Sequence, residues 1–149
     1  MLKDPLVKAQ YHFPGISVLV PKQHAGDVVA IDKGSLIPDK INMNTDRFTV
    51  IRMIGNIVLV NKADYENGKV NPVTTFDPPV EIRIGYNSFD VMKSNGDHLN
   101  LKLAYWDGKG WVIISDGSHE FTILPPSTGQ VAEAKLRSWL GDPPLAWGK

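Results

Sequence analysis

Short apolar runs, separated by glycine and proline, follow one another along the whole chain. The sequence contains 13 glycines and 11 prolines, and they are spread along it rather than gathered in a tail. Between them, apolar residues alternate with polar ones or form short continuous runs, as they do in β-strands. We count about ten such runs at spacings close to 10 residues, which is typical of a β-sandwich or barrel. The pattern predicts an all-β protein.

The expected strands lie between turn residues, most of them glycine, proline, asparagine or aspartate. They are residues 16–20, 27–31, 47–54, 57–60, 80–84, 99–103, 111–114, 120–124 and 145–147. Gly55 and Asn56 are expected to form a tight reversal that joins 47–54 to 57–60 as a β-hairpin. We therefore predict a single antiparallel β-sandwich of about nine or ten strands over residues 1–149, with little or no helix.

Two further segments need separate treatment. Residues 61–72 are polar, with Asn67 and Gly68 at their centre, and are expected to form a turn. Residues 131–140 contain the best helix formers of the chain, so propensity alone favours a helix there. Their small and apolar residues nevertheless alternate with charged ones, which fits a strand as well.

Charge and cysteine content exclude several classes of function. The 16 lysines and arginines balance the 16 aspartates and glutamates, so no nucleic-acid or anionic membrane surface is indicated. No apolar run approaches the roughly 18 residues of a membrane span. The chain contains no cysteine, which excludes disulfides, thiolate nucleophiles and cysteine-based metal sites.

No motif for catalysis or for a cofactor is found. Ser115, Asp116, Ser118 and His119 crowd one turn, but the chain contains no Gly-x-Ser-x-Gly nucleophile elbow. No glycine-rich turn of the phosphate-binding kind is present either. We therefore predict a protein that is not an enzyme, with no catalytic residues and no cofactor.

A metal site is also not expected. The four histidines lie far apart in the sequence, and no two have the short spacing that places two ligands on one element. The nearest alternative is a metal-dependent enzyme or small hydrolase that would use Asp97, His98, Asp116 and His119, if the loops that carry them were adjacent.

Aromatic residues surround the turn at residues 107–110. Tyr105 and Trp106 precede it and Trp111 follows it. Exposed aromatic side chains of this kind stack on sugar rings, so a carbohydrate-binding module is an alternative function. The simpler interpretation is that Trp106 and Trp111 pair across a hairpin and cover the edge of the core.

Two segments in the second half of the chain have a characteristic order of residues. Residues 76–86 read FDPPVEIRIGY, and residues 101–112 read LKLAYWDGKGWV. Together they resemble the second half of ZU5-like, immunoglobulin-like β-sandwich domains of bacterial surface and secreted proteins. The closing strands of such domains are similar to 131–139 and 145–147, which favours a strand for the ambiguous segment.

This resemblance covers roughly residues 70–149 and implies a non-catalytic module for adhesion, assembly or spacing within larger proteins. It implies other protein domains or subunits as partners, with a glycan as the alternative. The expected location is extracellular or in the cell envelope. The beginning of the chain contains no hydrophobic signal region, so a cytoplasmic location stays open.

Overall fold

The computed structural model describes residues 11–149 except 14, 25, 34–40, 117–119 and 140–143, and for His12 it describes the backbone alone. Its strands are β1 (Tyr11–Phe13), β2 (Ile16–Leu19), β3 (Val28–Asp32), β4 (Val50–Gly55), β5 (Ile57–Asn61), β6 (Thr75–Gly85), β7 (Lys102–Trp106), β8 (Trp111–Ile113), β9 (Glu120–Ile123), β10 (Val131–Ser138) and β11 (Leu145–Gly148). Two short helices, α1 (Lys62–Glu66) and α2 (Ser88–Lys93), and three 3-10 turns, η1 (Lys22–His24), η2 (His98–Asn100) and η3 (Ile114–Asp116), complete the described elements.

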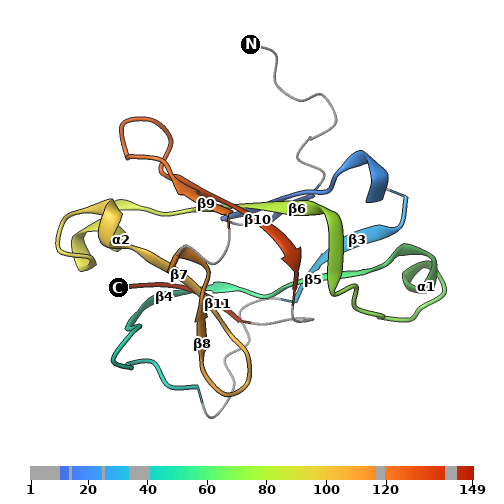
Figure 1. Cartoon of the computed structure of the whole chain (residues 1–149), viewed down its shortest axis with the longest axis horizontal. Coiled ribbons are helices and arrows are strands. Elements are labelled where there is room, and N and C mark those ends of the chain that lie inside the picture. Colours follow the sequence, from blue (N-terminus) through green and yellow to red (C-terminus); the bar gives the residue numbers. More distant parts are fainter. Residues whose placement is uncertain (1–10, 14, 25, 34–40, 117–119, 140–143) are drawn as a thin grey trace.

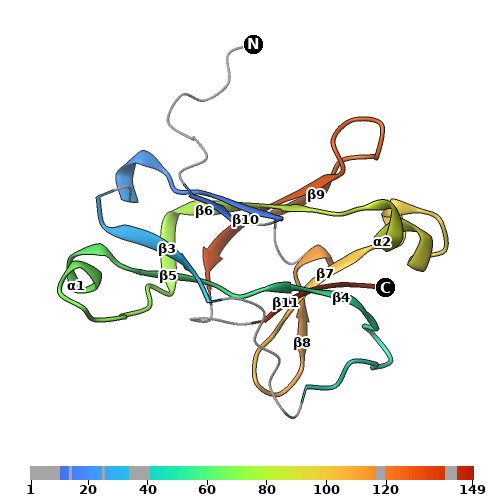
Figure 2. The same cartoon turned by 180° about the vertical axis from the view of Figure 1, so that it is seen from behind.

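The strands form three antiparallel sheets arranged in two layers (Figure 1). One layer is the five-stranded sheet β1-β2-β6-β10-β9. The other contains the four-stranded sheet β4-β11-β7-β8 and the pair β3-β5. Helices α1 and α2 lie at opposite ends of the molecule, and the carboxyl terminus lies at the α2 end (Figure 2). The expected all-β, antiparallel architecture is therefore confirmed, and the described residues form eleven strands rather than nine or ten.

The core lies between the two layers and is built by alternation along the strands. In β6, Val80, Ile82 and Ile84 are buried, whereas Glu81 and Arg83 lie on the outer face. The opposing layer contributes Leu103 of β7, Leu145 and the fully buried Trp147 of β11, and Leu59 of β5 to the same cluster. Period-two burial of this kind is what a sheet with one covered face requires.

Residues 131–138 form strand β10, not a helix. Ala132, Ala134 and Leu136 face the core at 1% exposure each. β10 hydrogen-bonds β6 on one side and β9 on the other. Two flanking strands satisfy its backbone groups, and this tertiary context overrides the helix propensity of the segment.

The prediction of a hairpin at Gly55 and Asn56 is wrong. β4 pairs with β11, and β5 pairs with β3, so the chain passes from one sheet into another instead of reversing. The carbonyl of Asn56 accepts the Lys33 amide at 2.8 Å, which holds the crossing point next to the end of β3. Residues 57–60 are buried on both faces of their strand. Other parts of the chain therefore cover β5 on each side.

Two further segments differ from expectation. Residues 62–66 form α1 within the stretch expected to be a turn, although a turn follows at Asn67 and Gly68. Leu99 was expected in a strand but lies in η2, where 68% of its surface is exposed. Within the part of the chain that the structure describes, no helix has the length and apolar character of a membrane span.

Candidate interaction surface

The connection between β6 and β7 contains α2 and η2, and we call residues 87–100 the α2–η2 segment. Its first turn is closed by a capping box. The side chain of Asn87 accepts the Asp90 amide at 3.0 Å, and the carboxylate of Asp90 accepts the Asn87 amide at 2.9 Å. These reciprocal bonds explain why a helix begins here although only six residues follow.

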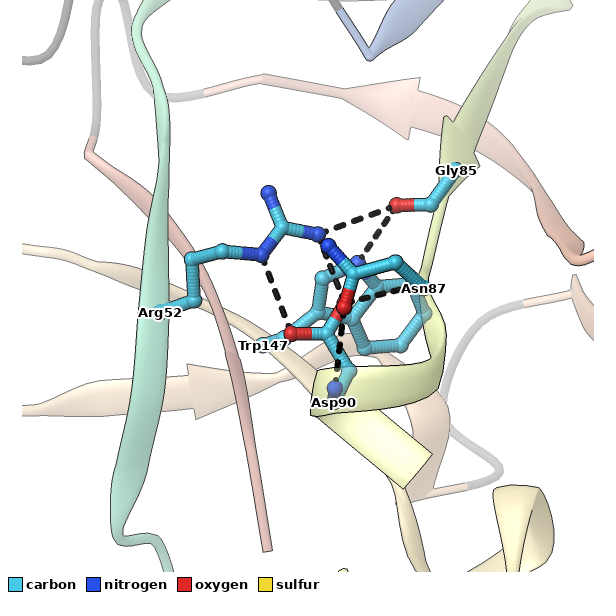
Figure 3. A network of polar contacts seen from close by, with 5 residues as sticks. All are labelled: Arg52, Gly85, Asn87, Asp90 and Trp147. Carbon is cyan, nitrogen blue, oxygen red and sulfur yellow. Dashed lines mark hydrogen bonds and ion pairs between the residues drawn. The ribbon is translucent and has the colours of Figure 1, made fainter. Parts of the chain in front are cut away.

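Asp90 also holds the segment to the sandwich. Its side chain is fully buried and faces Arg52 of β4, whose Nη2 lies 2.7 Å from Oδ2 and whose Nε lies 3.0 Å from Oδ1 (Figure 3). The pair is therefore bidentate, the geometry in which arginine and carboxylate interact most strongly. A buried carboxylate without such partners would be strongly destabilising.

The carbonyl of Gly85 connects this ion pair to both layers. It accepts a hydrogen bond from the Trp147 indole Nε1–H at 2.9 Å and a longer one from Arg52 Nη2 at 3.4 Å (Figure 3). Gly85 belongs to β6, while Arg52 and Trp147 belong to β4 and β11 of the other layer. The α2–η2 segment is thus fixed where the two sheets are joined by polar contacts.

The second half of the segment is held by its own polar groups. Ser94 is fully buried, and its hydroxyl lies 2.8 Å from the Val91 carbonyl and 2.9 Å from the Asp97 carbonyl. Asn100 Nδ2 donates to the Ser94 carbonyl at 2.9 Å. Asp97 caps η2 by accepting the Leu99 amide at 2.9 Å. Hydrogen bonds therefore order the backbone of this connection, in addition to the packing of Val91 against the core.

The outer side of the same segment presents three large apolar side chains among polar ones, and Lys93 Nζ lies 5.6 Å from the centroid of the Phe89 ring. Phe89 is 46% exposed, Met92 62% and Leu99 68%, and they are three of the six large hydrophobic residues exposed in the described part of the chain. Phe89 and Met92 lie three residues apart on α2, a spacing that places them on one helical face. We call Phe89, Met92 and Leu99 the apolar surface. The segment thus has inverted polarity in part: Asp90 and Ser94 are fully buried, although Val91 also packs against the core.

The sequence contains a signal for the helix of this segment, although no helix was predicted there. Asn87 followed three residues later by an acidic residue is the pattern of a capping box, although aspartate takes the place of the usual glutamate. Phe89 and Met92 at helical spacing extend it. What the pattern cannot show is that Asp90 faces inward, since its partner Arg52 is 38 residues away.

The aromatic residues at the β7–β8 hairpin pack against the protein itself. Trp106 and Trp111 are cross-strand partners whose rings meet edge to face at 5.4 Å, which confirms the pairing interpretation. Trp106 is buried at 8% exposure, and Trp111 also contacts Phe48 at 4.9 Å. The indole N–H of Trp111 donates to the Asn42 carbonyl at 2.6 Å. Glycan binding by these rings stays a prediction.

Tyr105 is half-buried and tilts against Trp139 at 5.5 Å. Burial, and then the charge of Asp107, raise the pKa of the Tyr105 phenol. The pKa of Asp107 is lowered by the backbone amides of Lys109 and Gly110, both 2.8 Å from its Oδ1. Asp107 therefore acts as the anchor of the hairpin turn.

The residues of the metal or hydrolase alternative are only partly described. Asp97 and His98 are adjacent, with 3.7 Å between His98 Nδ1 and Asp97 Oδ1. Asp116 lies in η3, and His119, like Ser118, falls outside the described residues. Among the residues that the structure describes, no three histidines or carboxylates gather in an arrangement that could hold a metal ion.

A shallow concavity of about 300 Å³ lies on the outer face of the five-stranded sheet, lined by Glu81, Glu120, Phe121, Thr122, Glu133 and Lys135. Its carboxylates have basic partners. Arg83 Nε lies 3.0 Å from Glu81 and 3.3 Å from Glu133, and Lys135 lies 4.0 Å from Glu120. These contacts form an exposed ion-pair network, and the concavity contains no carboxylate set apart for acid–base chemistry.

Comparison with family models finds no family that matches this chain. Searches of curated proteins and of solved structures find no match either.

Proposed function

We propose that this chain is a non-enzymatic β-sandwich module that binds another protein through the apolar surface formed by Phe89, Met92 and Leu99. The module belongs to a larger bacterial surface or secreted assembly, where it serves adhesion, assembly or spacing. The resemblance of residues 76–86 and 101–112 to ZU5-like domains supports this assignment. In the structure those residues contribute to β6 and to the β7–β8 hairpin.

The inverted polarity of the α2–η2 segment is the observation that carries the proposal. A short surface helix ordinarily turns its apolar residues inward. Here Asp90 and Ser94, both fully buried, take inward positions beside the partly buried Val91, while Phe89 and Met92 are exposed. Grouped exposed apolar side chains in a soluble fold are typical of a protein-binding surface.

Burial of the apolar surface would supply part of the free energy of binding, and contacts around it would have to supply the rest. Full burial of a leucine, methionine or phenylalanine side chain contributes about 1.5–3 kcal/mol. Because roughly half to two thirds of each side chain is still exposed, the remaining contribution of the three is about 3–5 kcal/mol together. The hydrogen-bonded backbone of the segment lowers the ordering cost of binding, since little conformational freedom remains to be lost.

Site-specific photo-crosslinking tests the proposal. A benzophenone amino acid at Met92 should form a protein adduct in the native assembly, and the same probe at Met43 is the matched control. Met43 is also an exposed methionine, at 40%, but it lies outside the α2–η2 segment. The adduct at Met92 should disappear when Phe89→Ser and Leu99→Ser are introduced together.

Those two serine substitutions together should lower the free energy of unfolding by about 1–2 kcal/mol, because about half of Phe89 and a third of Leu99 are buried. Loss of the adduct in a chain that is still folded under the assay conditions supports a binding surface. Adducts of equal yield at Met92 and Met43, or no adduct at either position, would contradict the proposal.

A further inference from the structure

Strand β9 forms one edge of the five-stranded sheet. The Leu124 amide donates to the Val131 carbonyl at 2.9 Å, and the register pairs Thr122 with Glu133. The N–H and C=O groups of successive residues in a strand point alternately to its two sides. The backbone groups of Thr122, two residues from Leu124, therefore hydrogen-bond β10 as well. The N–H and C=O groups of Phe121 and Ile123 then point away from β10, and no other described strand pairs with that edge.

β9 is short and begins with the charged Glu120, but it lacks the two residue types that most strongly block pairing at a sheet edge. Its four residues, EFTI, include no lysine and no proline, the two residues that most often discourage edge pairing. Phe121 and Ile123 pack on the core but are only partly buried. The chain carries no net charge, so two copies do not repel each other through their overall charge.

We propose that β9 pairs antiparallel with β9 of a second copy of this chain, about a twofold axis that passes beside Thr122. Phe121 of each copy then lies opposite Ile123 of the other, and the two Thr122 residues face each other. The two five-stranded sheets become one continuous sheet. This surface is separate from the apolar surface of α2–η2, so the two proposals are tested independently.

The sequence of β9 favours this register over one centred on Ile123. A twofold axis at Thr122 uses the outward amides and carbonyls of both Phe121 and Ile123, for four interchain hydrogen bonds. An axis at Ile123 would place Phe121 opposite Pro125, which has no amide hydrogen to donate. The selected register also brings together an aromatic residue with a β-branched one and a threonine with a threonine, which are favourable cross-strand pairs.

The expected association is weak. Four residues on each side make a small interface, below the roughly 1,200 Å² that stable complexes bury. Dimers should therefore form at high protein concentration and dissociate on dilution. Light scattering over a concentration series should show a mass that rises from one chain towards two.

A single cysteine at the axis gives the sharpest test, because the chain has none of its own. Facing residues that do not exchange hydrogen bonds in an antiparallel pair have Cα atoms about 4.5 Å apart, a separation that a disulfide can span. With oxidised glutathione as the oxidant, Thr122→Cys should therefore form the disulfide-linked dimer several-fold faster than Thr128→Cys. Thr128 is the matched control, since it is an exposed threonine in the turn that follows β9.

A charge exchange supplies the second readout. Thr122→Lys and Thr122→Glu each place two like charges at the axis, so each variant should stay monomeric at all concentrations. An equal mixture of the two should regain association, because opposite charges then face each other. Equal crosslinking rates for the two cysteine variants would overturn the proposal. The same holds if the parent chain and the mixture of the lysine and glutamate variants both stay monomeric.

Discussion

Replacing Asp90 by asparagine removes the negative charge from the buried ion pair while it preserves the shape of the side chain. Asp90 is fully buried and accepts two hydrogen bonds from Arg52 and one from the Asn87 amide. In Asp90→Asn the amide NH2 group faces Arg52 Nε if it takes the place of Oδ1, and it faces both Arg52 Nη2 and the Asn87 N–H if it takes the place of Oδ2; all of these groups are donors. At least one charge-assisted bond is therefore lost.

The expected cost follows from the exposure of the two partners. Removing one partner of a buried pair costs about 3–5 kcal/mol. The Arg52 side chain is 34% exposed, so water solvates part of the released guanidinium, and the expected loss falls to about 2–3 kcal/mol. For a domain of this size that corresponds to a melting temperature lower by roughly 5–10 °C.

Urea unfolding followed by tryptophan fluorescence measures the loss, and a double-mutant cycle isolates the pair. Asp90→Asn, Arg52→Met and the double variant should give a coupling of about 1.5–2.5 kcal/mol. The control is Arg83→Met, which breaks contacts of a surface arginine that is 43% exposed and should cost less than about 1 kcal/mol. A coupling below about 0.5 kcal/mol would refute the reasoning that this ion pair anchors the α2–η2 segment.

Two further substitutions test close packing and pH dependence. A Cβ at Gly148 would lie 2.5 Å from the Phe48 ring, so Gly148→Ala should lower the free energy of unfolding by about 3 kcal/mol. In the control Gly85→Ala, the Cβ would meet no atom closer than 3.9 Å, so the free energy of unfolding should hardly change. Equal losses of unfolding free energy in the two variants would argue against steric overlap as the cause. Burial and the Asp107 charge raise the pKa of Tyr105 when the chain is folded. The unfolded chain therefore ionises first, near pH 10, and stability that is fully present below that pH is lost as the pH rises towards the folded pKa. Tyr105→Phe should make this alkaline loss shallower in unfolding curves taken between about pH 8 and pH 11, and an unchanged slope would contradict it.

The strands were predictable wherever one face of the sheet is covered by the core and the other is exposed to solvent. In β6 the alternation of Val80, Ile82 and Ile84 with charged residues is visible in the sequence and reappears as burial. The pairing of Trp106 with Trp111 was equally predictable, since a short turn leaves the two strands it joins little choice of partner. Local spacing alone carries this information.

Pairing between distant segments was not predictable in the same way. Gly55 and Asn56 have the composition of a tight turn, yet the chain continues from β4 into β5 because their partners, β11 and β3, come from opposite ends of the sequence. The segment 131–138 has helical propensity, yet it is a strand because β6 and β9 lie on both sides of it. Such contacts override intrinsic propensities of a few tenths of a kcal/mol per residue.

By itself, then, the sequence determined most of the strand-forming segments, the antiparallel all-β class and most of the turns, because period-two burial and turn chemistry act over a few neighbouring residues. Only the tertiary structure decided which strands are neighbours, which edge is left unpaired at β9, and which side of α2 faces solvent. The last of these depends on Arg52, which reaches Asp90 from β4 and holds this carboxylate on the inner side of the helix. Phe89 and Met92 are left outside as a consequence, and no pattern of neighbouring residues contains that information.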